Sequence, residues 1–340
     1  MATNKANEGG GAWSPHLLRF PKQAILFYCY VMHTIATLLS ALMLFVGGIA
    51  DSFARTADFI AAPLSPPEHR EATIIFGGDM MFDRSIRVAA EQNGGDYLFS
   101  CLDPVLKSAD LVIANLEGPI TDHASVSVGS AVGASDNFTF TFPTSTAPLL
   151  LAHNIRIVNL GNNHITNFRD SGVESTVQYL AGSGVGFFGD PIAQRVATTT
   201  VNGIRLAFIN YNQFSQSSTA AKTIEQIAAA RDAGYLPIVY THWGEEYKPA
   251  TDSEKSLAHR FVDAGAEMVI GSHPHVVQEH EDYRGKYIYY SLGNLIFDQY
   301  WDDAVTHGLL LTVIVDGSGV KGVAERGVEL ERDRRTCPLE

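Results

Sequence analysis

Two histidines, separated by one proline, follow a short apolar segment near residue 270. The run Glu267–Ile270 predicts a buried strand that Gly271 ends, and Pro274 stiffens the step from His273 to His275. Sheets of α/β proteins bind ligands at the carboxyl ends of their strands, and neutral imidazole is a common ligand for zinc, iron, manganese and nickel. Because this spacing is common, the motif alone fits two solvated loop histidines equally well.

Four other apolar runs, at residues 73–76, 111–114, 155–160 and 237–240, also predict strands and lead into polar residues. In chain order they deliver Asp79, Glu117, Asn163 with His164, and His242. Carboxylates, an amide oxygen and imidazoles form the mixed ligand set that suits Mn²⁺, Fe²⁺ or Zn²⁺, and the lack of a thiolate argues against a structural zinc. We therefore expect one or two divalent cations, which at a spacing of about 3.5–4 Å can clamp a phosphoryl oxygen.

Each of these candidates also has a plainer explanation, because loops are polar in general. Asp79 could cap a helix, Glu117 could be a solvated turn residue, and His242 could be a hydrogen-bonded core histidine. The pair Asn163 and His164 could reflect turn chemistry alone. Two further charged residues, Glu246 and Arg84, fit either an exposed surface or the site, where Arg84 would face an anionic substrate.

The composition describes an acidic chain with ample core material. It has 340 residues, 46% of them hydrophobic, and a formal net charge of −13. This charge argues against nucleic acid as a partner and fits a domain that offers carboxylates to cations. The three cysteines, Cys29, Cys101 and Cys337, are too few and too scattered for a disulfide framework or a zinc finger, so no role is assigned to them.

Residues 24–50 contain no Asp, Glu, Lys or Arg and are long enough to cross a bilayer as a helix. Basic residues precede this segment and Asp51 follows it, so we expect a cytoplasmic N-terminus and an extracytoplasmic body. A cleavable signal peptide is the alternative, and it also places the body outside the cytoplasm. We expect a cytoplasmic tail at 1–23, a signal-anchor at 24–50, a linker at 51–71, one domain at 72–330 and a tail at 331–340.

Strand and helix patterns alternate along the body, which predicts an α/β domain with a partly parallel core. The sequence Asn202-Gly203 predicts the turn of a β hairpin. A second hairpin is expected between residues 276 and 290, and a short edge strand at residues 139–142. The expected helices lie at 84–92, 170–181, 223–233 and 253–264.

Read together, the polar segments form an ordered series of motifs. They are Gly78-Asp79-x-Met81 with Arg84, Asn115-Leu116-Glu117, Asn162-Asn163-His164, His242-Trp243-Gly244-x-Glu246-Tyr247, Gly271-Ser272-His273-Pro274-His275 and Ser291-Leu292-Gly293-Asn294. This series, spanning about residues 72–315, resembles the CapA/PgsA family of poly-γ-glutamate capsule biosynthesis proteins, a branch of the calcineurin-like metallophosphatase superfamily.

The resemblance implies a four-layer α/β/β/α fold, a membrane anchor, and a role in making, anchoring or exporting an anionic polymer at the bacterial surface. It implies metal ligands at Asp79, Glu117, Asn163, His242, and His273 or His275, with His164 beside the phosphoryl group. Met81 stands where the wider superfamily has an imidazole, which leaves one or two ions open. Asn167 stands where many members have an aspartate.

Three functions follow as hypotheses. The first is a membrane-anchored protein of poly-γ-glutamate capsule assembly that works with capsule-synthase membrane proteins. The second is an extracytoplasmic metal-dependent phosphoesterase that acts on another phosphodiester. The third is a non-catalytic scaffold of a polymer-export complex. The expected ligands are accordingly a divalent metal (Mn, Fe or Zn) and an anionic polymer or a phosphoester.

Overall fold

The computed structural model describes residues 70–193 and 195–339 of the chain, which belong to one compact unit. Within this described part, no helix combines the length and the apolar character needed to cross a bilayer. The expected cytoplasmic tail at 1–23, the expected signal-anchor at 24–50 and nearly all of the expected linker lie outside the described residues.

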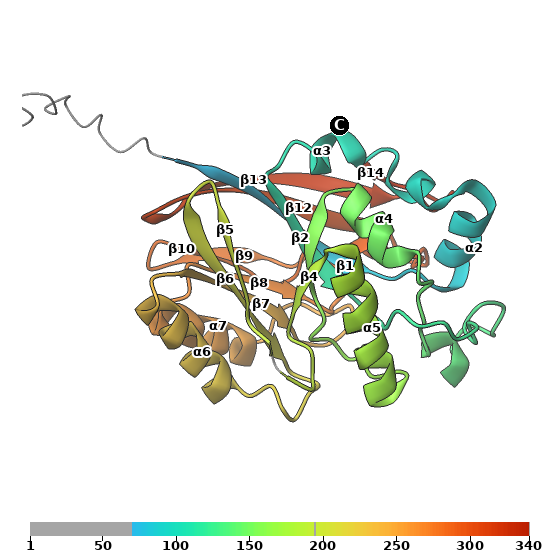
Figure 1. Cartoon of the computed structure of the whole chain (residues 1–340), viewed down its shortest axis with the longest axis horizontal. Coiled ribbons are helices and arrows are strands. Elements are labelled where there is room, and N and C mark those ends of the chain that lie inside the picture. Colours follow the sequence, from blue (N-terminus) through green and yellow to red (C-terminus); the bar gives the residue numbers. More distant parts are fainter. Residues whose placement is uncertain (1–69, 194, 340) are drawn as a thin grey trace, which may run out of the picture. The chain divides into compact units, whose positions relative to one another are not determined.

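The strands of the described part form two sheets (Figure 1). The larger has the order β14-β13-β12-β1-β2-β3-β4, and β11 also pairs with β1. Strands β1 to β4 are parallel, whereas β12, β13 and β14 extend the sheet by antiparallel pairing. Its strands are β1 (Ala72–Met80), β2 (Leu111–Leu116), β3 (Ile155–Asn159), β4 (Gly186–Phe188), β11 (Asn294–Ile296), β12 (His307–Asp316), β13 (Gly319–Leu330) and β14 (Thr336–Pro338).

The smaller sheet has the order β5-β6-β7-β8-β10-β9, with a parallel centre and an antiparallel strand at each edge. The Asn202-Gly203 turn joins β5 to β6, as the sequence predicts. The partly parallel α/β core expected from the sequence is therefore present. The strands are β5 (Ala197–Val201), β6 (Ile204–Asn212), β7 (Leu236–His242), β8 (Met268–Ser272), β9 (His280–Tyr283) and β10 (Lys286–Tyr289).

The two sheets pack face to face, and helices cover their outer sides (Figure 1). Helices α2 to α5 pack on the larger sheet, and α6 and α7 pack on the smaller one. A capping box, in which Thr251 and Glu254 bond each other's backbone N–H groups, fixes the start of α7. The helices are α2 (Arg84–Asn93), α3 (Asp103–Leu106), α4 (Thr146–Ala152), α5 (Arg169–Ser183), α6 (Ala220–Asp232) and α7 (Asp252–Ala264), with short 3₁₀ turns η2 (Gly95–Phe99), η3 (Ser135–Phe138) and η4 (Asp303–Thr306).

Side-chain alternation along β1 shows why these layers form. Ile74 and Phe76 point into the core between the sheets, whereas Ile75 points into the core under helices α2 to α5. All three are fully buried, so both faces of this strand exclude water. Its neighbour β2 is likewise buried along its whole length, which explains the continuous apolar run at residues 111–114.

Three expectations from the sequence differ from the structure at the margins of the domain. Residues 139–142 form an isolated bridge between Phe142 and Ile120 instead of an edge strand. The second hairpin pairs continuously only from His280 to Tyr289, and the residues before it extend the pairing through an isolated bridge between Val277 and Leu292. Residues 336–338, expected in a tail, form β14 and extend the larger sheet.

A disulfide joins Cys101 to Cys337, which corrects the view that the cysteines have no role. The bond links the segment between η2 and α3 to the last strand of the larger sheet, across 236 residues of sequence. The spacing of the cysteines did not indicate this pair, because strand β14 lies next to the first part of the domain only in the folded structure.

Opening this disulfide is expected to destabilise the protein by about 2–4 kcal/mol, since the bond closes a very long loop in the unfolded chain. Urea unfolding of the Cys337→Ser variant, followed by tryptophan fluorescence, measures the loss. The variant Cys29→Ser leaves the bond intact and is the control. An equal midpoint for Cys337→Ser and the wild type would contradict the expectation.

Candidate metal centre

Side chains from both sheets meet at the carboxyl ends of their parallel strands. Asp79 is the penultimate residue of β1, and Glu117 directly follows β2. His242 ends β7, and His273 and His275 follow β8. All five side chains are at most 4% exposed, so the strand ends enclose a buried polar pocket rather than a surface patch.

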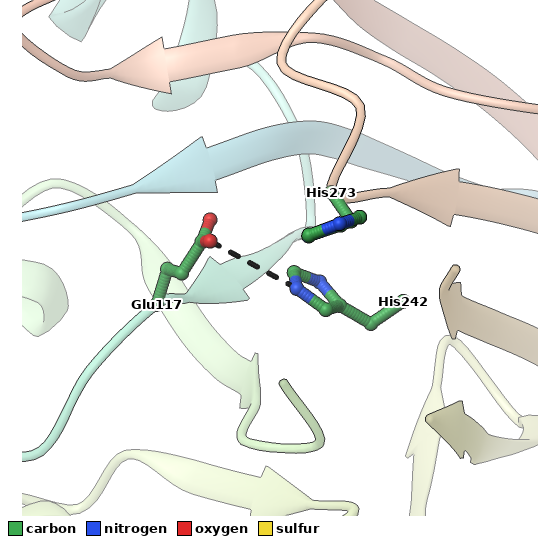
Figure 2. A group of neighbouring side chains, drawn as sticks. All are labelled: Glu117, His242 and His273. Carbon is green, nitrogen blue, oxygen red and sulfur yellow. Dashed lines mark ion pairs between the residues drawn. The ribbon is translucent and has the colours of Figure 1, made fainter. Parts of the chain in front are cut away.

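The ligand atoms fall into two groups that share one carboxylate. Glu117, His242 and His273 form the first group, and Asp79, Glu117 and His275 form the second. Within each group the ligand atoms lie within 4.8 Å of one another. Figure 2 shows the first group, in which both imidazole rings lie beside the Glu117 carboxylate. A shared carboxylate is the arrangement that would hold one ion or bridge two.

Asn163 joins the first group through its side-chain oxygen. Its Oδ1 lies 2.7 Å from His242 Nε2, and Glu117 Oε1 lies 3.8 Å from the same nitrogen. The structure thus brings together all six predicted ligands: Asp79, Glu117, Asn163, His242, His273 and His275.

Neighbouring hydrogen bonds fix which ring nitrogen of His242 and of His275 faces the pocket. Ser272 Oγ donates to Thr241 O and therefore accepts from His242 Nδ1 at 2.9 Å. Asn294 uses its NH₂ group as a donor to Val305 O, so its Oδ1 accepts from His275 Nδ1 at 3.0 Å. Both rings then present an unprotonated Nε2 towards Glu117, as metal-ligating histidines do.

The Glu117 carboxylate has no donor to satisfy it. Neither oxygen has a hydrogen-bond partner among the described residues, although the side chain is fully buried. Burial, and then the charge of Asp79, raise the pKa of Glu117 well above its usual value. A buried carboxylate facing imidazole lone pairs is costly unless a positive charge lies between them, so the residues present fit a divalent cation.

The imidazoles are held in the neutral, ligating form. Burial lowers the pKa of His273 to about 4 and that of His275 to about 3, and it lowers the pKa of His242 well below the usual value. Burial raises the pKa of Asp79 to about 7, against the hydrogen bonds it accepts from Asn115 Nδ2 and His273 N. All four shifts have burial as their largest cause.

The backbone at His273 and His275 is strained. His273 and His275 have φ values of 99° and 57°, in the region that favours glycine. Just before them, the backbone of Gly271 packs closely against the residue that follows β10. A Cβ added to Gly271 would lie 1.8 Å from Tyr290 O. This close contact and the positive φ values turn both imidazoles towards the pocket.

A row of buried asparagines, joined by hydrogen bonds, supports the pocket. Asn115 Oδ1 accepts from Asn159 Nδ2 at 2.9 Å and from Asn162 Nδ2 at 3.2 Å. Asn159 Oδ1 in turn accepts from Asn210 Nδ2 at 3.0 Å. The row links β2 and β3 of the larger sheet to β6 of the smaller one, so it fixes the position of one sheet relative to the other at the site.

His164 lies beside the ligand groups, outside both of them. Its Nδ1 donates to Asn167 Oδ1 at 3.1 Å, and its ring packs on Phe140 with a centroid distance of 4.4 Å. Burial lowers its pKa to about 4. Asn167 therefore provides the acceptor that orients this ring.

Arg84, predicted to face an anionic substrate, is paired within the protein. Its Nη2 donates to Asp298 Oδ1 at 2.5 Å, and its guanidinium lies over the rings of Phe140 and Phe297. The side chain is only 13% exposed. Arg84 is therefore close to the pocket, but its charge is compensated by Asp298.

Comparison with known proteins identifies the family of the chain. The family model described as "Bacterial capsule synthesis protein PGA_cap" matches residues 73–299, which is more than half of the chain. The chain belongs to this family.

Two curated relatives have names that refer to capsule or PGA biosynthesis. The chain is 30% identical over 263 residues to "Capsule biosynthesis protein CapA" of Bacillus anthracis, covering 71% of this chain and 63% of the relative. It is 29% identical over 245 residues to "PGA biosynthesis protein CapA" of Bacillus subtilis (strain 168), covering 66% of this chain and 63% of the relative. The match thus spans slightly less than two thirds of each relative's length.

Several residues that shape the site of this PGA_cap domain were not predicted. Asn294 and Ser272 orient two histidines, and both lie inside the quoted motifs, so a search for acceptors beside each histidine could have found them. Asp298 compensates Arg84 from 214 residues away, and no sequence signal connects the two.

Replacing Asn294 with alanine is expected to weaken divalent-metal binding about 10- to 100-fold, because His275 loses the acceptor that fixes its tautomer. Titration with Mn²⁺ in a calorimeter measures the change. The matched control is Asn154→Gly, which removes a buried amide far from the site while suiting a residue with φ 64°. Unchanged Mn²⁺ affinity in Asn294→Ala would contradict the orienting role.

Proposed function

We propose that this protein serves the synthesis, anchoring or export of poly-γ-glutamate at the bacterial surface, through a divalent-cation site. The single observation that carries the proposal is the donor-free, buried Glu117 shared by two ligand groups in a chain of the PGA_cap family. The names of the curated relatives suggest the polymer, and the arrangement of the side chains suggests the site.

The proposal includes kinship with calcineurin-like metallophosphatases. Two face-to-face sheets covered by helices, with ligands at strand ends of both sheets, support it. Asp79, Glu117, Asn163 and the three histidines would hold one or two ions of Mn, Fe or Zn. Such an ion would polarise a phosphoryl or carboxylate oxygen of the substrate.

The remaining residues position groups around that oxygen. His164 is held by Asn167, so it would lie beside the reacting group and exchange a proton with a leaving oxygen. Arg84 is fixed by Asp298 and would act on the substrate through its field rather than through a free guanidinium.

An extracytoplasmic, membrane-anchored location belongs to the same proposal. Its support is the apolar segment at residues 24–50 and the Cys101–Cys337 disulfide, since disulfides persist mainly in oxidising compartments. Membrane proteins of a capsule synthase are the partners this placement suggests.

A second candidate is a metal-dependent phosphoesterase acting on a different phosphodiester. The observation that favours it concerns the one arginine predicted to face the substrate: among the described residues, Arg84 is already compensated by Asp298. A polyanionic substrate would gain little from such surroundings.

The test is deletion of the gene in its own bacterium and complementation with variants. Deletion should abolish a surface γ-glutamyl polymer, the wild-type gene should restore it, and the double variant Asp79→Ala/His242→Ala should fail, with equal protein amounts confirmed by immunoblot. An unchanged polymer after deletion would refute the capsule role. Full restoration by the double variant would instead favour a non-catalytic scaffold.

A further inference from the structure

A groove of about 610 Å³ opens beside the candidate cation site. This volume lies within the usual range for binding sites of small ligands. Arg84 and Glu246 line the groove, and the charges of both act on Glu117, which places the groove next to the shared carboxylate. Phe138, Tyr247 and Trp301 supply its aromatic walls.

Tyr247 connects the groove to the histidines. Its ring lies 6.2 Å from the His275 ring and 5.5 Å from the Trp301 ring, measured between centroids. Its hydroxyl accepts from Gln299 Nε2 at 3.1 Å, and Gln299 Oε1 accepts from Asn294 Nδ2 at 3.0 Å. Asn294 also orients His275, so the groove and the cation site share one rigid wall.

Large apolar side chains are exposed along this groove. Val132 is 95% exposed, Trp301 61%, Phe138 47%, Tyr247 40% and Val128 39%. A soluble surface rarely gathers apolar groups in this way unless they meet a ligand or a partner.

The charges of the groove do not suit a polyanion. Arg84 is the one cationic residue among its lining residues in the described part of the chain, and Asp298 already pairs with it. Glu246 adds a further negative charge, so the lining carries a formal net charge of −1. An anionic group would be attracted only by a cation at the adjoining ligand groups.

We propose that the groove binds the aliphatic chain of a phosphoester of a long-chain alcohol, while its phosphoryl group lies at the cation site. The apolar walls suit an uncharged chain, and a cation at the ligand groups would hold the anionic head. This inference rests on the proposed function to the extent that it requires a bound cation.

The test uses the full chain, purified in a maltoside detergent, and two non-hydrolysable probes with the same head, methylphosphonate and hexylphosphonate. With Mn²⁺ present, hexylphosphonate should bind at least about thirtyfold more tightly, because each buried methylene adds to the affinity. Calorimetric titration measures both constants, and a separate Mn²⁺ titration reports the cation site alone.

The double variant Phe138→Ala/Trp301→Ala should reduce the preference for the hexyl chain to less than about threefold, with methylphosphonate affinity unchanged. Both side chains are largely exposed, so the variant should fold normally. Ile192→Ala removes an apolar side chain that is 53% exposed and does not line the groove, and it should keep the full preference.

The outcomes separate the two proposals. If Mn²⁺ binds but the probes bind equally, or if the double variant keeps the hexyl preference, the inference is overturned and the cation site stands. If hexanol binds as tightly as hexylphosphonate, the groove takes any apolar group and the phosphoester is wrong. If Mn²⁺ itself does not bind, the proposed cation site fails, and the head-group placement fails with it.

Discussion

Replacing Glu117 with glutamine is expected to weaken Mn²⁺ binding by at least about a hundredfold, while the stability of the metal-free protein changes by less than about 1 kcal/mol. The amide keeps the size of the side chain but removes the charge shared by both ligand groups. Since neither carboxylate oxygen has a hydrogen-bond partner among the described residues, the substitution breaks no bond within the protein.

Calorimetric Mn²⁺ titration and urea unfolding in a chelator measure the two quantities on the same preparation. Glu245→Gln is the matched control, because this exposed glutamate lies close to the site in sequence and makes no part of either ligand group. A variant that lost stability and kept its Mn²⁺ affinity would show that Glu117 has a structural role.

Replacing Gly271 with alanine is expected to lower the free energy of unfolding by more than about 4 kcal/mol, or to prevent folding. The added Cβ would lie 1.8 Å from Tyr290 O and 2.8 Å from Trp243 Nε1, which itself donates to that carbonyl. Backbone and a buried ring cannot yield by that distance, so β8 would have to separate from its neighbours next to the histidines.

Gly182→Ala provides the matched comparison for this substitution. Gly182 lies in helix α5 with nothing within 4 Å of the added Cβ, so alanine should raise the stability by up to about 1 kcal/mol. Denaturant unfolding of both variants decides the matter. Similar stabilities for Gly271→Ala and Gly182→Ala would show that the close contact at β8 is relieved at little cost.

The sequence predicted that the six candidate ligands would lie together because each stands at or just after the end of an apolar run. Parallel strands bring their carboxyl ends to one edge, so Asp79, Glu117 and Asn163 had to meet if β1, β2 and β3 were neighbours. The same argument joined His242 to His273 through β7 and β8. The positions of the strand ends therefore predicted most of the side chains that meet there.

Other features depend on contacts between residues far apart in the sequence, which no local pattern specifies. The compensation of Arg84 by Asp298 joins residues 214 positions apart, and the row of Asn159 and Asn210 crosses between the sheets. The prediction of an edge strand at residues 139–142 was wrong for a local reason. Its apolar residues Phe140 and Phe142 pack into the core beneath the helices, so burial rather than pairing explains their pattern.

The covalent link between Cys101 and Cys337 encloses almost the whole domain, including the exposed loop around residues 122–137. A protease that cut this loop once would leave two fragments still tethered to each other. The nicked molecule would then run as one band on a gel without reductant and as two bands with it. Such a molecule would keep its pocket assembled from both pieces.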